Sequence, residues 1–389
     1  MAVAGRALLV VLVVLAAASA AQASPRLRLG ITDSGAALYG DGSIYPALRE
    51  LRASILRVHL NWGGRAGVAR RMPRDPSDPE DPAYDWRPYD RIVLAAATNG
   101  VEVVFTIFGT PPWENGGRTP TRAPRDTSEL EDFSYAAATR YSGTYKRADG
   151  TVLPAVRRWT AWNEPNLRIG LYEQWRRVAG KWVAQSARDY ARICNGIVLG
   201  VHATLVAGER VACGVTAARG NNNPRGEHQS VSPIVFLRAM AAAGARGFDA
   251  YAHHPYNGSM TETPSSRPRG PSAVTLGNID VLENELARLY RRPVPLWLTE
   301  YGYQTNPPDR LFGVSPAKQA AYLAEAFAIA RRDPRIDVLL WFLLRDERDV
   351  TRWQSGLVTA AGKRKPAFAA FRRAASSLPT AATPTSARP

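Results

Sequence analysis

Two glutamates stand where a short apolar run gives way to a turn. Glu164 lies in the segment Trp-Thr-Ala-Trp-Asn-Glu-Pro-Asn, and Pro165 behind it blocks further strand pairing. Glu300 lies in Leu-Trp-Leu-Thr-Glu-Tyr-Gly, where Gly302 can make the turn. Two carboxylates that face one concave site can cleave a glycosidic bond, because one protonates the leaving oxygen while the other, ionised, attacks or supports the anomeric carbon. The alternative for either glutamate alone is a strand-end carboxylate paired with an arginine.

The segments that must position these glutamates alternate between strand-like and helix-like patterns. Continuous runs rich in Val, Ile, Phe and Trp are typical of strands buried on both faces, and eight such runs cover residues 27–32, 55–60, 101–108, 156–162, 210–215, 248–252, 295–299 and 336–343. Helical segments are expected at 89–98, 171–203, 233–243, 278–291 and 317–331. Strands that alternate with helices form parallel β/α units, so the sequence predicts an α/β protein with a single (β/α)8 TIM barrel over residues 24–374.

Long polar segments rich in Gly and Pro follow several of the predicted strands, at 65–86, 111–125, 217–232 and 257–272. In a (β/α)8 barrel the active site is built from such strand-to-helix loops, at the carboxyl ends of the strands. By this count Glu164 follows the fourth strand and Glu300 the seventh. We therefore expect both carboxylates to face the central mouth of the barrel.

The chain resembles the glycoside hydrolases of clan A, in particular families 5 and 39. These are retaining (β/α)8 enzymes with catalytic glutamates on the fourth and seventh strands. The resemblance rests on Asn-Glu-Pro after the fourth strand together with the glutamate of the seventh. It implies that Glu164 is the general acid/base, that Glu300 is the nucleophile and that Asn163 binds the sugar 2-hydroxyl. This chemistry requires no metal and no cofactor.

The same resemblance implies roles for side chains on other strands. Arg57, at the end of the second strand, would hydrogen-bond the nucleophile; the alternative is a solvated arginine. His254 and Tyr256 lie in His-His-Pro-Tyr after the sixth strand, where the tyrosine hydroxyl would orient the nucleophile. The paired histidines have no further ligand at metal-binding spacing, so no metal site is predicted there. Trp341 of the eighth strand would floor a sugar subsite, unless it is a core residue.

Trp113 follows the third predicted strand in the stretch Phe-Gly-Thr-Pro-Pro-Trp. Cellulase-like members of the clan carry a histidine near this position, whereas this stretch is similar to members related to β-xylosidases and β-galactosidases. We expect Trp113 to contact substrate. Packing in the core or a loop is an equally compatible reading for Trp113, and the same two alternatives apply to Trp62, Trp162 and Trp353.

The composition excludes several classes of protein. The 389 residues contain 50 Lys and Arg against 34 Asp and Glu, a formal charge of +16, with the basic residues spread along the chain. No nucleic-acid-binding module is recognisable, so an arginine-rich solvated surface is expected, and a preference for acidic polysaccharide stays open. The sequence also lacks the Gly-x-Ser-x-Gly, Walker A, His-Glu-x-x-His and Gly-x-Gly-x-x-Gly motifs.

The two ends of the chain do not fit the barrel pattern. Arg6, an apolar run at 7–20 and Ala-Gln-Ala at 21–23 predict a signal peptide over residues 1–23, with a single anchoring helix as the alternative. Residues 375–389 are rich in Ala, Pro, Ser and Thr and predict a disordered tail. Export permits a disulfide between Cys194 and Cys213, but two buried free thiols are equally compatible with the sequence.

These observations predict a secreted, extracellular enzyme that cleaves O-glycosidic bonds, expected to be β, in an oligo- or polysaccharide by double displacement. Its expected partner is the carbohydrate substrate, without nucleic acid and without a membrane once the signal is removed. The alternatives are a cell-wall transglycosylase, which shares every residue named above, and a non-catalytic carbohydrate-binding barrel.

Overall fold

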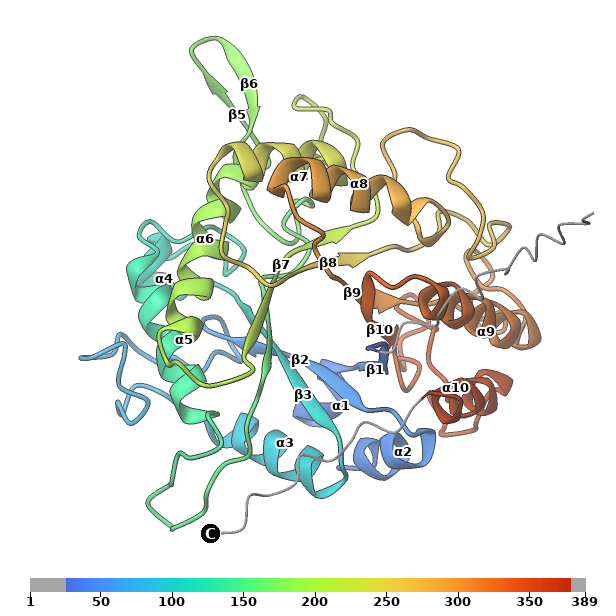
Figure 1. Cartoon of the computed structure of the whole chain (residues 1–389), viewed down its shortest axis with the longest axis horizontal. Coiled ribbons are helices and arrows are strands. Elements are labelled where there is room, and N and C mark those ends of the chain that lie inside the picture. The colour runs from blue at the N-terminus through green and yellow to red at the C-terminus, as the bar shows by residue number, and fades with distance from the viewer. Residues whose placement is uncertain (1–25, 379–389) are drawn as a thin grey trace, which may run out of the picture.

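The computed structural model describes residues 26–378. The predicted signal peptide and residues 379–389 of the predicted tail lie outside the described residues. Parallel strands close into a barrel with helices around it, in the order β1-β10-β9-β8-β7-β4-β3-β2 (Figure 1). The predicted (β/α)8 barrel is therefore confirmed.

The barrel strands follow the predicted runs closely. They are β1 (Arg28–Thr32), β2 (Ile55–Asn61), β3 (Glu102–Phe108), β4 (Arg158–Ala161), β7 (Arg210–Ala217), β8 (Ala250–His254), β9 (Leu296–Tyr301) and β10 (Ile336–Phe342). The sheet closes where β1 pairs in parallel with β10. Because every barrel strand is parallel to its neighbours, all the carboxyl ends open at one mouth.

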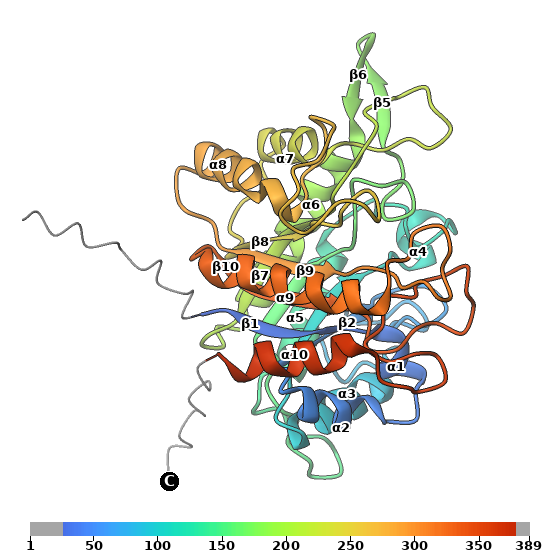
Figure 2. The ribbon, with the colours of Figure 1, turned by 90° about the vertical axis from the view of Figure 1, so that its right-hand side faces the viewer.

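Helices surround the barrel on its outside (Figures 1 and 2). They are α1 (Ser34–Tyr39), α2 (Ile44–Leu51), α3 (Arg87–Thr98), α4 (Pro112–Asn115), α5 (Ser128–Arg140), α6 (Gln185–His202), α7 (Pro233–Ala242), α8 (Ile279–Tyr290), α9 (Pro316–Arg332) and α10 (Pro366–Ser376), with a 3-10 turn at Leu276–Asn278. Helix α10 thus extends two residues into the segment predicted as a tail. Within residues 26–378, no helix has the length and apolarity needed to span a membrane.

The core has two layers, which explains why the strands read as continuous apolar runs. The inner layer fills the barrel and is drawn from the strands and their immediate ends: Ile55, Val104, Ala212, Val215, Ala250, Ala252, Trp297, Val338 and Leu340. The outer layer lies between the strands and the helices and includes Leu56, Phe105, Leu298 and Leu339. Successive side chains of a strand point to opposite faces, so β2, β3, β7, β8, β9 and β10 each supply both layers.

The expected helix over 171–203 is wrong in its first half. Residues of this segment form an antiparallel hairpin of β5 (Trp175–Val178) and β6 (Lys181–Ala184), and α6 begins only at Gln185. Ala179 and Gly180 at the tip have positive φ angles of 46° and 80°. Positive φ at both central residues is the requirement of the tight turn that matches strand twist, so turn chemistry overrides the helical composition here. The hairpin projects from the body of the molecule (Figures 1 and 2).

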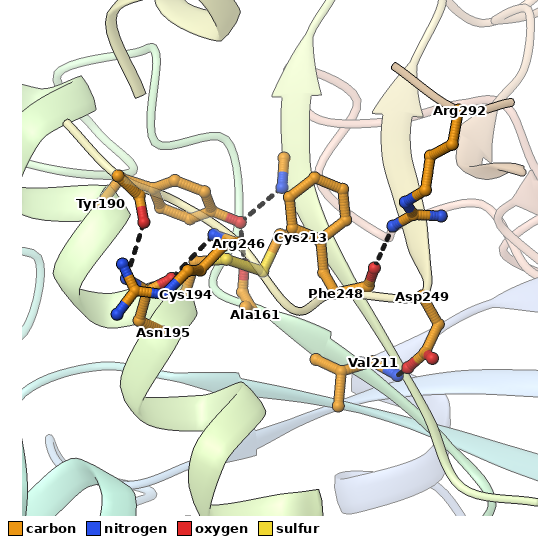
Figure 3. The surroundings of a disulfide bond; sticks show 12 residues. Ala161, Tyr190, Cys194, Asn195, Val211, Cys213, Arg246, Phe248, Asp249 and Arg292 are labelled. Atoms are coloured by element: carbon orange, nitrogen blue, oxygen red, sulfur yellow. Dashed lines mark hydrogen bonds between the residues drawn. A yellow bond between two sulfur atoms is a disulfide. The ribbon is translucent and has the colours of Figure 1, made fainter. Parts of the chain in front are cut away.

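A disulfide joins Cys194 of α6 to Cys213 of β7, with the two Cα atoms 5.9 Å apart (Figure 3). This finding decides between the two readings that the sequence left open. One turn away on α6, the buried hydroxyl of Tyr190 donates to the carbonyl of Ala161 (2.8 Å) and accepts from the N–H of Gly214 (2.6 Å). Helix α6 is therefore fixed to both β4 and β7, the strands beside Glu164.

Removing this covalent link should lower stability. The bridged residues are 19 positions apart, and for a loop of this size the chain-entropy model gives a contribution of about 3 kcal/mol. We expect Cys194→Ala/Cys213→Ala to lower the free energy of unfolding by that amount, which urea unfolding measures as a lower midpoint. The control is thiol titration of the unreduced wild type in denaturant, which should find no free thiol. An unchanged unfolding midpoint in the double variant would contradict the prediction.

Candidate active site

The chain turns sharply where Glu164 leaves the barrel. Trp162 and Glu164, directly after β4, have positive φ angles of 67° and 44°, a conformation that costs energy for residues with large side chains and that concentrates at functional sites. Hydrogen bonds hold this turn: the Glu164 N–H donates to the Val215 carbonyl (2.9 Å), and the Trp162 indole donates to the Gly170 carbonyl (2.8 Å). Glu164 is thereby held at the rim, as the sequence predicts.

The two glutamates meet at the mouth of the barrel. Glu300 is the residue before the last one of β9, and one carboxylate oxygen of Glu164 lies within 4.8 Å of one of Glu300. Neither carboxylate is far from water, because the side chain of Glu164 is 18 % exposed and that of Glu300 is 11 % exposed. The fold thus brings together two residues that are 136 positions apart in the sequence.

The guanidinium of Arg57 is fully buried at the centre of this site. It donates to Oε1 of Glu300 (2.7 Å), to Oδ1 of Asn163 (2.7 Å) and to the hydroxyl of Thr106 (2.8 Å). A guanidinium presents its donors in a rigid fork, so these bonds fix the orientation of both the carboxylate and the amide. The predicted contact of Arg57 with Glu300 is present, and the solvated alternative is excluded.

Tyr256 and His254 contact the carboxylates from the neighbouring strand. The Tyr256 hydroxyl donates to Oε2 of Glu300 (3.3 Å). His254 places Nδ1 3.0 Å from Oε1 of Glu164 and Nε2 3.0 Å from the hydroxyl of Thr299. Burial, with the nearby charge of Arg57, lowers the pKa of His254 to about 4, so the ring is neutral at neutral pH.

The two glutamates differ in their polar partners. Burial raises the pKa of Glu164 to about 7, against a smaller lowering effect of Arg57. Glu300 instead accepts hydrogen bonds from a guanidinium and a tyrosine. Near neutral pH, Glu164 can therefore carry a proton beside a carboxylate that is held by a cation. Two carboxyl groups in such different surroundings can act as acid and base in one reaction.

The prediction that Trp341 forms the floor of a sugar subsite is wrong. Its side chain is fully buried, and its indole N–H donates to the carbonyl of Ser355 (2.8 Å). Val338 and Leu340 belong to the inner layer of the core, whereas Trp341 belongs to the outer layer. The alternation of side chains along β10 therefore turns Trp341 toward the helices. The alternative, a core tryptophan, is the correct one.

The other tryptophans divide between core and surface. Trp62 and Trp162 are buried in the core. Trp113 of α4 is half-buried and donates its indole N–H to Glu129 of α5 (3.1 Å), so its contact with substrate stays a prediction. Trp353 is 40 % exposed, and its ring stacks on Tyr256 with centroids 5.5 Å apart. Trp353, on the loop after β10, is therefore an exposed ring that packs on the tyrosine bonded to Glu300. In the sequence its only signal is an aromatic residue in a polar loop.

Glu164, His254 and Glu300 also offer ligand atoms that lie within 4.8 Å of one another, a spacing that a metal ion can use. Arg57 donates to Glu300 at 2.7 Å, however, and so places a fixed positive charge against one of these ligands. A cation at this point would be repelled by the guanidinium. The arrangement is better suited to one carboxyl group that transfers a proton and a second that acts as a carboxylate.

No protein-family model and no curated protein sequence matches the chain. Solved structures match its fold across 90–92 % of its length at 13–17 % identity. One is a glucosidase from Croceicoccus marinus, 16 % identical, with a TM-score of 0.66 over 92 % of this chain and 67 % of that chain. Another is a family 39 glycoside hydrolase from Bacteroides cellulosilyticus WH2, 17 % identical, with a TM-score of 0.62 over 92 % of this chain and 64 % of that chain. A third is an endo-1,4-beta-mannanase from Rhizomucor miehei, 13 % identical, with a TM-score of 0.56 over 90 % of this chain and 94 % of that chain. The chain thus spans about two thirds of the length of the first two. At these identities the likeness shows the barrel fold.

Arg57 should be coupled energetically to Glu300. Arg57→Met leaves Glu300 buried without its cation, and breaking a buried pair on one side costs about 3 kcal/mol or more. We expect the double variant Arg57→Met/Glu300→Gln to be more stable than Arg57→Met, because it removes the unpaired charge. Urea unfolding measures both. Arg267→Met, which breaks an exposed pair with Asp280, is the control and should change stability by less than about 1 kcal/mol. Additive losses in the double variant would contradict the coupling.

Proposed function

We propose that the chain is a retaining glycoside hydrolase. The observation that carries the proposal is the pair Glu164 and Glu300, whose oxygens approach within 4.8 Å at the mouth of a (β/α)8 barrel. Retaining enzymes hold their carboxyl groups about 5–5.5 Å apart, whereas inverting enzymes leave about 6.5–9.5 Å for a water molecule. The short approach therefore supports direct attack by one carboxylate.

Each step of the reaction has a group in place for it. Glu300, ionised and oriented by Arg57 and Tyr256, attacks the anomeric carbon while Glu164 gives its proton to the leaving oxygen. The glycosidic bond breaks and an ester to Glu300 forms. Glu164 then takes a proton from water, which attacks the same carbon and releases the ester. Asn163, fixed by Arg57, is positioned to bond a sugar hydroxyl.

The resemblance to clan A implies β-linked oligo- or polysaccharides as substrates, and the solved structures that share the fold include a glucosidase and a mannanase. Secretion belongs to the same proposal and rests on residues 1–23. A transglycosylase would use the same groups and differ only in the acceptor. The binding-only alternative is disfavoured, because a binding barrel has no need of a carboxyl group with a pKa near 7 beside a second carboxylate.

The roles of the two glutamates can be tested with activated substrates. A panel of 4-nitrophenyl β-glycosides identifies the sugar, and NMR of the first product should show the β anomer. Glu300→Gln should abolish turnover of every substrate. Glu164→Ala should lose about 10²–10⁴-fold on unactivated glycosides, yet keep the first step with a 2,4-dinitrophenyl glycoside, and added azide should give the β-glycosyl azide.

The control for both variants is Asp280→Asn, on the exposed surface of α8, which should keep wild-type rates. Identical behaviour of Glu164→Ala and Glu300→Gln on activated substrates and with azide would refute the assigned roles. An α anomer as first product would refute retention. A product extended by added acceptor sugar, formed in preference to hydrolysis, would favour the transglycosylase.

Activity should depend on the protonation of Glu164. Its pKa is raised to about 7, so the acid form is present below that pH and is lost as the pH rises through it. We therefore expect kcat/KM to fall with a midpoint near pH 7 on the alkaline side. In Glu164→Gln, assayed with a 2,4-dinitrophenyl glycoside, this limb should be absent. A wild-type limb centred near pH 4.5, the ordinary range of a glutamate, would contradict the assignment.

A further inference from the structure

A cavity of about 930 Å³ lies beside the glutamate pair, walled largely by the loops that follow β8, β9 and β10. Tyr256 belongs to both places, because its hydroxyl bonds Glu300 while the residue also lines the cavity. Trp353 stacks on the Tyr256 ring and lines the cavity as well. A molecule that reacts at Glu300 therefore has this cavity next to it.

The lining exposes large apolar side chains to water. Leu311 is 77 % exposed, Phe312 60 % and Val350 59 %, and all three line the cavity together with Trp353. Apolar surface left in water is unfavourable, and a cluster of it at a concave site is typical of a place where another molecule binds. These side chains come from two loops that are separate in sequence, so the cluster is a product of the fold.

Hydrogen bonds hold the apolar side chains in this position. The carboxylate of Asp309 accepts from the N–H groups of Leu311 (2.8 Å) and Phe312 (3.0 Å), so the loop tip is fixed. At the base of both loops, the buried ammonium of Lys365 donates to Thr305 (2.8 Å), to Asp346 (2.7 Å) and to the carbonyl of Gln354 (3.0 Å). The loops after β9 and β10 are thus tied together, and the cavity exists before any ligand arrives.

Most polar side chains of the lining are already bonded within the protein. Examples are Arg219 with Glu262, Asn257 with Tyr301 and Thr263, Ser259 with Thr261, Gln304 with the N–H of Gln354, and Thr351 with Asp349. Arg310 also lines the cavity. A sugar ring carries hydroxyl groups that need partners when they lose water, and few are free here. The cavity is better suited to a hydrocarbon than to a further sugar unit.

We propose that this cavity binds an apolar aglycone, a long alkyl chain or an aromatic ring system that is joined through oxygen to the sugar held at the glutamates. The proposal rests on the proposed function. In the reaction, the aglycone oxygen takes the proton of Glu164 as its bond to the anomeric carbon breaks, and the aglycone leaves as an alcohol or a phenol. The preferred substrate is then an amphiphilic glycoside, a narrower class than the oligo- and polysaccharides that the sequence implies.

The first test compares alkyl glycosides of the sugar found in the 4-nitrophenyl screen. Methyl and octyl β-glycosides have leaving groups of similar acidity and differ in the hydrocarbon that the cavity would bury. We expect kcat/KM for the octyl compound, below its micelle concentration, to exceed that for the methyl compound by about tenfold or more. Leu311→Ser/Phe312→Ser should remove this preference and leave the methyl glycoside unaffected. Both side chains are largely exposed, so the variant should fold.

A second readout does not depend on turnover. The neutral fluorophore N-phenyl-1-naphthylamine should bind the wild type saturably, be displaced by the octyl glycoside but not by the methyl glycoside, and bind about tenfold more weakly to Leu311→Ser/Phe312→Ser. Leu205→Ser is the matched control, because Leu205 is 89 % exposed but lies between α6 and β7, outside the lining of the cavity. It should behave as the wild type in both assays.

The outcomes separate the two proposals. An active enzyme with equal kcat/KM for methyl and octyl glycosides would overturn the aglycone site and leave the proposed function standing. Fluorophore binding that the double variant does not weaken would likewise overturn the site. A protein that releases no sugar from any glycoside would overturn the proposed function, and the aglycone role with it, even where the fluorophore binds.

Discussion

The buried guanidinium of Arg57 is the constraint on which the site depends. A cation without water is costly unless its donors are satisfied, and here the partners come from β9, from the turn after β4 and from β3. These segments reach one point only because the barrel closes in register, with Arg57 beside Val104 of β3 and Thr32 of β1. The two carboxylates and Arg57 therefore come together only when the sheet is closed.

The same guanidinium makes the two glutamates unequal. Glu300 receives its N–H directly, whereas Glu164 receives only its more distant charge and faces the neutral ring of His254. Burial then acts on Glu164 with little to oppose it and favours the protonated form. Under the proposed function, one carboxyl group is thus suited to give a proton and the other to form a bond, and the difference comes from their positions around a single arginine.

The sequence predicts most of this arrangement, and its failures have local causes. The sequence points to Glu164 and Glu300 because each follows or ends an apolar run and is followed closely by a turn-forming residue, Pro165 or Gly302. Trp341 was misassigned because a run that is apolar on both faces does not reveal which side chains point inward. The composition of residues 175–184 predicts helix, but the turn at Gly180 pairs the segment into a hairpin. The cavity beside Trp353 was out of reach, because it needs three loops placed in space.

The shared anchor of the loops after β9 and β10 also bears on how such a protein diversifies. Lys365 holds both loops at their bases, while residues 309–312 and 350–353 form their tips. Substitutions at the tips change which molecules fit without disturbing the anchor or the carboxylates below it. Under the proposed function, the choice of substrate can therefore change at these few positions while Glu164, Glu300 and Arg57 stay the same.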